Sequence, residues 1–130
     1  MNKITSKYGI IAVEGACAAS NGVDPLNAWQ ASAAKIFADS PSSEHKSCPK
    51  SAFLGLAVLG EIAGVKPGEY TKSIDNKRYA KDALALLRSN DSWSKDPLTL
   101  WNRVMGGVDK KHNYQMDVVI ALWEARMFVG

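Results

Sequence analysis

Apolar residues recur at helical spacing along most of the chain, and no stretch shows the strict alternation typical of a β-strand. The first stretch covers residues 6–20 and ends at Asn21-Gly22, a common stop signal for a helix. Asp24 then predicts the N-cap of a second helix, with Pro25 in its first turn. The pattern therefore predicts a protein built from helices.

Four more helices are predicted further along the chain. One begins at Pro49, with Ser47 or Cys48 as its cap, after a polar loop over residues 39–47. The others cover residues 74–88, the segment between Asp96-Pro97 and Gly106-Gly107, and residues 113–128.

Two of these helices are expected in the centre of the molecule. Residues 52–59 are apolar on every side, and the helix over residues 113–128 has a wide apolar stripe. Gly55 lies in the first of them, where a glycine lowers helix stability by about 1 kcal/mol. Its presence suggests that another backbone passes close to this residue.

These elements predict an all-α fold, a compact single-domain bundle of about six helices over residues 1–130. Hydrophobic residues make up 46% of the chain and charged residues 22%. That composition can build a core without a disulfide framework, and it is too apolar for a disordered chain. No run of about 18 apolar residues occurs, so neither a membrane span nor a membrane partner is predicted.

One motif occurs twice: Asp24-Pro25-Leu26-x-x-Trp29 returns as Asp96-Pro97-Leu98-x-x-Trp101. Two pseudo-repeated three-helix units, residues 8–62 and 79–128, would explain it, and so would chance use of a good helix opening. If the duplication is real, the helices predicted at 49 and 113 begin at equivalent places. Their N-termini would then make an anion-attracting pocket.

The net charge of +3 arises in the middle third of the sequence. Residues 41–81 carry seven Lys and Arg against four acids, whereas the segments on either side are neutral. This excess is small for a nucleic-acid-binding protein. At most it indicates a weak preference for anions, and ordinary surface charge is the favoured explanation.

A cytoplasmic location is predicted, because the apolar run Tyr8–Val13 is cut by Glu14 and is too short for a secretory leader. Cys17 and Cys48 are then expected as reduced thiols. The sequence alone leaves a disulfide between them open.

The segment Ser47-Cys48-Pro49-Lys50 places a thiol at a predicted helix N-terminus, next to lysines. Both features favour the thiolate form, so the segment is a candidate reactive thiol or anion-binding site. A helix cap beside a solvated lysine explains the same residues.

The segment Lys111-His112-Asn113-x-Gln115-x-Asp117 gathers a base, two amides and a carboxylate at another helix start. His112 would pair with Cys48 as base and nucleophile, oriented by Asn113 or Asp117, if the fold brings them together. Alternatively, Asn113 is the helix cap and Asp117 lies near the positive end of the helix dipole.

A third group, Tyr70-Thr71 with Asn76-Lys77-Arg78-Tyr79, would grip a phosphate, or it is an exposed helix start whose Tyr79 packs inward. No cofactor is predicted, because phosphate-binding and dinucleotide-binding motifs are missing. No metal site is predicted either, because His45 and Cys48 make only a weak metal pair and the other Cys and His lie far from them in the sequence.

Four segments together resemble an uncharacterised bacterial family of small helical proteins, a domain of unknown function. They are Cys48-Pro49-Lys50-x-Ala52-Phe53-Leu54-Gly55-Leu56, Gly68-x-Tyr70-Thr71, Asn76-Lys77-x-Tyr79-Ala80 and Lys111-His112-Asn113-x-Gln115-Met116-Asp117-Val118-Val119. The chain departs from the family pattern at Val58 and Leu59, where acidic residues are expected, and at Tyr114, where a small residue is expected. The resemblance implies no activity, only that these segments belong together.

Three functions fit the sequence. The favoured hypothesis is a non-catalytic binding or accessory protein that recognises another protein or a small anionic ligand. The second is a small enzyme that uses Cys48 or His112, supported by Lys50, Lys77 and Asp117. The third is a nucleic-acid-binding protein that uses Lys46, Lys50, Lys72, Lys77 and Arg78. The oligomeric state is open.

Overall fold

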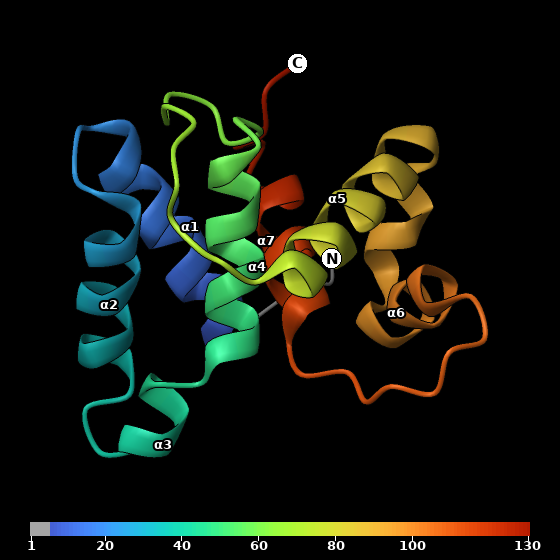
Figure 1. The fold of residues 1–130 in the computed structure, drawn as a ribbon, viewed down its shortest axis with the longest axis horizontal. Coiled ribbons are helices and arrows are strands. Elements are labelled where there is room, and N and C mark those ends of the chain that lie inside the picture. Colours follow the sequence, from blue (N-terminus) through green and yellow to red (C-terminus); the bar gives the residue numbers. More distant parts are fainter. Residues whose placement is uncertain (1–5) are drawn as a thin grey trace.

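The computed structural model describes residues 6–130, and these residues form an all-α fold (Figure 1). The helices are α1 (Lys7–Ser20), α2 (Pro25–Ile36), α3 (Pro41–Glu44), α4 (Ser47–Val58), α5 (Ile74–Ser89), α6 (Pro97–Met105) and α7 (Gln115–Glu124). A 3₁₀-helix, Asp91–Lys95, connects α5 to α6. Within residues 6–130 the only β-type pairing is an isolated antiparallel bridge between Ile62 and Phe128. The predicted all-α fold with about six helices is confirmed.

The two Asp-Pro-Leu-x-x-Trp motifs open α2 and α6 as the sequence predicts. The Asp24 carboxylate accepts a hydrogen bond from the Asn27 N–H, and the Asp96 carboxylate accepts one from the Leu98 N–H. Both tryptophans of the motif are buried. These are the local features that any duplication would share, and the duplication itself stays a prediction.

Three segments differ from the sequence prediction. The polar loop over residues 39–47 contains α3, a single turn with Pro41 at its first position, where proline is favoured. α4 begins at Ser47 rather than at Pro49, and its N-cap is Lys46, so neither Ser47 nor Cys48 caps it. The 3₁₀-helix is too short to leave a periodic apolar pattern.

α7 is shorter than the predicted helix over residues 113–128, because a left-handed residue stands on each side of it. Tyr114 has φ 67° and Arg126 has φ 58°. An L-residue in this conformation cannot continue a right-handed helix. The N-cap position is therefore Tyr114, and the prediction that Asn113 caps the helix is wrong.

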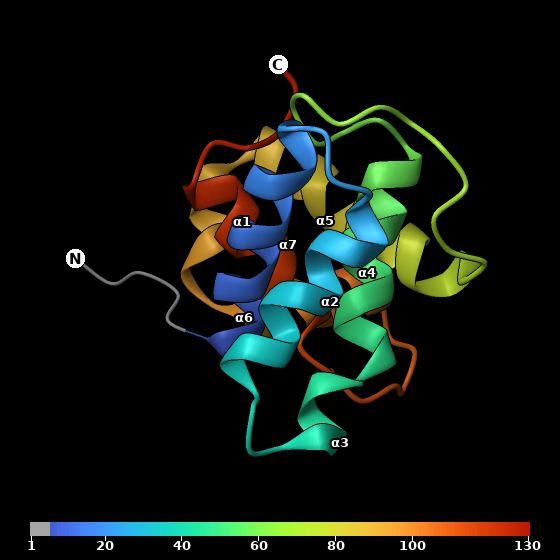
Figure 2. The same ribbon diagram turned by 90° about the vertical axis from the view of Figure 1, so that its left-hand side faces the viewer.

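The core is built around α7, which lies between α1, α4 and α5 (Figures 1 and 2). Every residue from Gln115 to Leu122 is buried. α4 is the second central helix, since residues 51–57 are all buried. Both predictions of a central helix are confirmed, and none of the helices in the described residues is long and apolar enough to cross a membrane.

Gly55 has the role that the sequence suggested. A Cβ atom at this position would lie 2.7 Å from the Cα atom of Lys77, so α4 and α5 cross backbone against backbone. Lys77, a candidate ligand-binding residue, is thus fixed at a helix crossing. Cys17 and Cys48 are both free thiols, and no disulfide joins them.

Candidate functional site

A buried amide holds the start of α7 in place. Gln115 is fully buried, and its Oε1 accepts a hydrogen bond of 2.7 Å from the Asn113 N–H. Its Nε2 donates to Oδ1 of Asn76, in α5, over 3.1 Å. Gln115 therefore connects two helices and pairs a backbone group of the preceding loop, which is a structural task.

The N-cap position of α7 is Tyr114, but the side chain of His112 supplies a capping hydrogen bond to the helix. Its Nε2 accepts a hydrogen bond of 3.1 Å from the Met116 N–H, one of the donors that a helix N-terminus leaves unpaired. The imidazole packs against the ring of Trp101, with centroids 5.2 Å apart. The indole N–H of Trp101 donates to the carbonyl of Lys110, which fixes the loop before the histidine.

Burial lowers the pKa of His112, and the nearby carboxylates of Asp117 and Asp96 oppose that shift. The neutral imidazole is also the form that the cap requires, because only an unprotonated Nε2 accepts a hydrogen bond. The proton of the neutral ring then lies on Nδ1.

A cleft of about 500 Å³, here called the His112 cleft, lies beside this helix start. Its lining residues are Asp96, Pro97, Leu98, Lys111, His112, Tyr114 and Asp117. Asp117 is buried, with Oδ1 3.9 Å from Nε2 of His112. Hydrogen bonds from Thr99 and from the Leu98 N–H lower the pKa of Asp96. Lys111, His112 and Asp117, three of the candidate residues, thus line one cleft.

Cys48 belongs to a different helix start, that of α4. The His112 cleft has no cysteine among its lining residues, and Cys48 is half-buried near the start of α4. No group of three or more His, Cys, Asp and Glu suited to a metal ion occurs within the described part of the chain. The pairing of Cys48 with His112 as nucleophile and base gains no geometric support.

The third group of candidates serves local structure. The Tyr70 hydroxyl donates to the carbonyl of Lys66, and Oγ1 of Thr71 accepts from the Ser73 N–H. Tyr79 is buried, and its ring meets the Trp101 ring edge-on at a centroid distance of 5.2 Å. These contacts hold the loop before α5 and the packing of α5 on α6.

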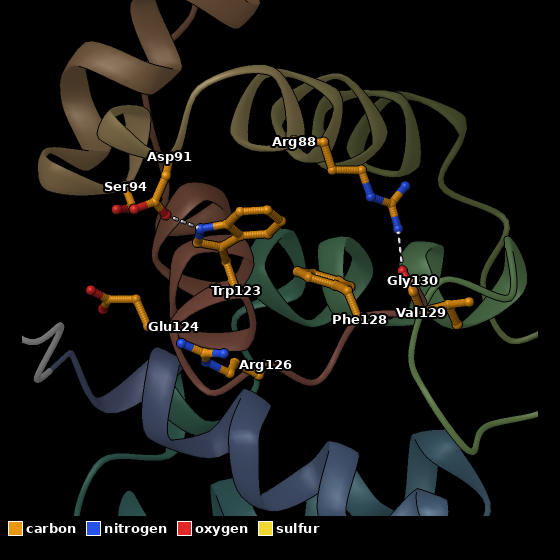
Figure 3. A pocket seen from close by; sticks show the side chains of 9 residues that line it. All are labelled: Arg88, Asp91, Ser94, Trp123, Glu124, Arg126, Phe128, Val129 and Gly130. Carbon is orange, nitrogen blue, oxygen red and sulfur yellow. Dashed lines mark hydrogen bonds between the residues drawn. The ribbon is translucent and has the colours of Figure 1, made fainter.

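A second cleft, here called the Arg126 cleft, lies at the other end of α7 and has a volume of about 710 Å³ (Figure 3). Its lining residues are Arg88, Asp91, Ser94, Trp123, Glu124, Arg126, Phe128, Val129 and Gly130. None of them is a candidate that the sequence pattern indicated.

Backbone groups alone close α7 at this end. The N–H of Arg126 donates to the Trp123 carbonyl and the N–H of Met127 donates to the Leu122 carbonyl, over 3.1 and 3.0 Å. This is a Schellman motif, and its left-handed position is normally a glycine. Arg126 occupies it here with φ 58°.

The chain after α7 pairs with the loop after α4. The N–H of Ala63 donates to the Met127 carbonyl and the N–H of Val129 donates to the Glu61 carbonyl, each over 2.8 Å. Since the backbone is satisfied in this way, the side chains at this end of α7 are not needed as caps.

The side chains that line the Arg126 cleft differ in how many hydrogen bonds and ion pairs they form within the protein. Arg88 donates through Nη2 to the Val129 carbonyl and to Glu61, and the Trp123 indole donates to Asp91 (Figure 3). Arg126 is exposed, and its guanidinium forms no hydrogen bond or ion pair with any residue from 6 to 130. The one sequence signal for this site is the arginine where a glycine would be expected after a helix.

A family model described as "Family of unknown function (DUF6979)" matches residues 5–129 of the chain. No curated protein and no solved structure matches it.

Proposed function

Because the chain belongs to the DUF6979 family, which has no assigned activity to transfer, we propose a function from its own geometry: a non-catalytic binding protein for a small organic anion. The ligand is a carboxylate or phosphate attached to an apolar or aromatic group. Its anionic end meets Arg126 and its apolar part lies against Trp123 and Phe128, in the Arg126 cleft.

The observation that carries this proposal is the conformation of Arg126. A non-glycine residue in the left-handed region is strained, and glycine at this position would relieve the strain. Such strain concentrates at functional sites, where it places a side chain that the site requires. Here the strained residue carries a guanidinium, the group best suited to carboxylates and phosphates.

The rest of the cleft favours a small monoanion with an apolar part. Trp123 and Phe128 are only partly buried and offer ring surface. Arg88 is a second cation, but Asp91 and Glu124 also belong to the lining, so the formal charges balance. A polyanion such as a nucleic acid would meet both carboxylates, and the cleft does not favour it.

A binding role is favoured over the enzyme hypothesis for a reason of geometry. The imidazole Nε2 of His112 already accepts the Met116 N–H, so it is not free to take a proton from a nucleophile. The cleft beside it also has no cysteine in its lining.

The experiment is a titration of the isotope-labelled protein with benzoate and with phenyl phosphate, followed by NMR at the indole N–H of Trp123. Benzamide is the matched neutral ligand. Arg126→Gln removes the proposed cation, and Arg103→Gln is the matched control, because Arg103 does not line the cleft.

Saturable shifts are expected with both anions in the natural protein and in the Arg103→Gln variant. Loss of a charge-assisted hydrogen bond of about 1.5–3 kcal/mol should weaken binding to Arg126→Gln roughly tenfold or more. Equal binding of benzamide, equal binding by Arg126→Gln, or no shift with either anion would overturn the proposal.

A further inference from the structure

The His112 cleft contains a mostly buried carboxylate whose side chain is still 12% exposed. Asp117 is 8% exposed and belongs to the lining of the cleft. Within residues 6–130 no hydrogen bond reaches its carboxylate, and its ion-pair contact is with His112, 3.9 Å from Oδ1 to Nε2. Burial of an ionised carboxylate is costly unless a donor or a cation compensates it.

His112 does not supply that compensation while its ring is neutral. Nε2, the nitrogen 3.9 Å from Asp117, is the acceptor of the Met116 N–H and carries no proton to donate. The carboxylate therefore lines the cleft as a hydrogen-bond acceptor.

The walls of the cleft fit a cation on an aliphatic chain. Tyr114 is 43% exposed and its ring stands 6.4 Å from the His112 ring, while Leu98 is 57% exposed. Aromatic faces attract ammonium and guanidinium groups, and apolar side chains cover a methylene stem. Asp96 adds negative charge, against a single cationic lining residue, Lys111.

We propose that the His112 cleft binds a primary ammonium or guanidinium group carried on an aliphatic chain, with Asp117 as the residue that takes the cation. Tyr114 and Leu98 enclose the stem, and Asp96 strengthens the local negative potential. This site is independent of the anion site, which lies at the opposite end of α7.

The experiment is an NMR titration with n-butylammonium at pH 7.5, followed at the backbone amides of residues 114–118. The matched neutral ligand is n-butanol. Asp117→Asn keeps the size of the side chain and removes its charge, and Lys111→Gln removes the competing cation. A capped lysine, Nα-acetyl-lysine N-methylamide, distinguishes a protein side chain from a free amine as the source of the cation.

Butylammonium is expected to bind saturably and butanol not at all. Asp117→Asn should weaken binding at least tenfold, and Lys111→Gln should strengthen it about two- to fivefold, while benzoate binding at the Arg126 cleft stays unchanged in both. Tighter binding of the capped lysine than of butylammonium would assign a protein partner, and equal binding would assign a free amine.

The proposal is overturned if butylammonium shifts none of these amides, or if butanol shifts them equally. It is also overturned if Asp117→Asn binds as the natural protein does. Should Asp117→Asn fail to fold, an unchanged affinity in Lys111→Gln would overturn the proposal instead.

Discussion

The two ends of α7 differ in how their unpaired backbone groups find hydrogen-bond partners. Each end has a non-glycine residue in the left-handed conformation and a cleft beside it. At the N-terminal end, the side chains of His112 and Gln115 pair with backbone N–H groups. At the C-terminal end the backbone groups pair with one another, and the side chain of Arg126 is not used to cap the helix.

The comparison separates structural from functional polar residues. A polar side chain that satisfies the backbone cannot also engage a ligand without loss of stability. The residues with unusual chemistry in the sequence are mostly of that kind, whereas Arg126 is strained and unengaged. We therefore expect loss of the His112 or Gln115 side chain to lower stability, and loss of the Arg126 side chain to weaken anion binding.

The largest effect is expected from Gln115→Ala. It deletes a fully buried side chain and two hydrogen bonds and leaves the Asn113 N–H without its partner. The free energy of unfolding should fall by about 3 kcal/mol. Urea denaturation measures it, with Asn76→Ala as a milder companion. A loss below about 1 kcal/mol would mean that Gln115 is not part of the structural cap.

The second effect is a pH dependence that arises from His112. Its pKa is lowered in the folded protein, so the unfolded chain takes up a proton first as the pH falls. The stability that His112 contributes is complete above its unfolded pKa of about 6.5, and it is lost as the pH falls through the lower folded pKa.

His112→Asn tests this prediction, because asparagine offers an acceptor for the Met116 N–H but does not titrate. The difference in unfolding free energy between the natural protein and the variant should be independent of pH above 7 and shrink toward pH 5. Glu14 and Asp96 titrate in a lower range, because hydrogen bonds lower the pKa of both. If the difference in unfolding free energy did not depend on pH, the role of His112 in capping α7 would be contradicted.

The third effect contrasts the two left-handed residues. Arg126→Gly relieves backbone strain without loss of a described hydrogen bond or ion pair, so the protein should gain about 1 kcal/mol. Tyr114→Gly relieves similar strain but loses the ring contact with Tyr8, whose centroid lies 4.7 Å away. Such a contact is worth about 0.5–1.5 kcal/mol, so the net change should be near zero. Thermal unfolding of the two variants measures both changes in stability. Equal stabilisation of Arg126→Gly and Tyr114→Gly would contradict the predicted difference.

Periodicity was sufficient to predict the helices, because each of the longer ones buries an apolar stripe. Gly55 even indicated the close crossing of α4 and α5, since a Cβ atom at this position would lie only 2.7 Å from the Cα atom of Lys77. The short α3 and the 3₁₀-helix bury nothing in a periodic manner and left no such signal.

The candidate sites were harder to predict for a physical reason. The sequence showed that His112 and Asp117 stand near one helix start, because they are neighbours along the chain. It did not show that Nε2 of His112 would cap α7, nor that Arg88 of α5 would face the end of α7. Both facts depend on how separate helices pack, and the pattern of residues within one segment does not indicate them.

The most direct test of the central claim is the free energy of unfolding of the natural protein and Arg126→Gly, each with and without benzoate, at constant ionic strength. At a benzoate concentration ten times its Kd, the natural protein should gain about 1.4 kcal/mol from ligand linkage. Arg126→Gly should be more stable than the natural protein without ligand and gain almost nothing from benzoate. An Arg126→Gly variant that is less stable, or that gains as much from benzoate, would contradict the account.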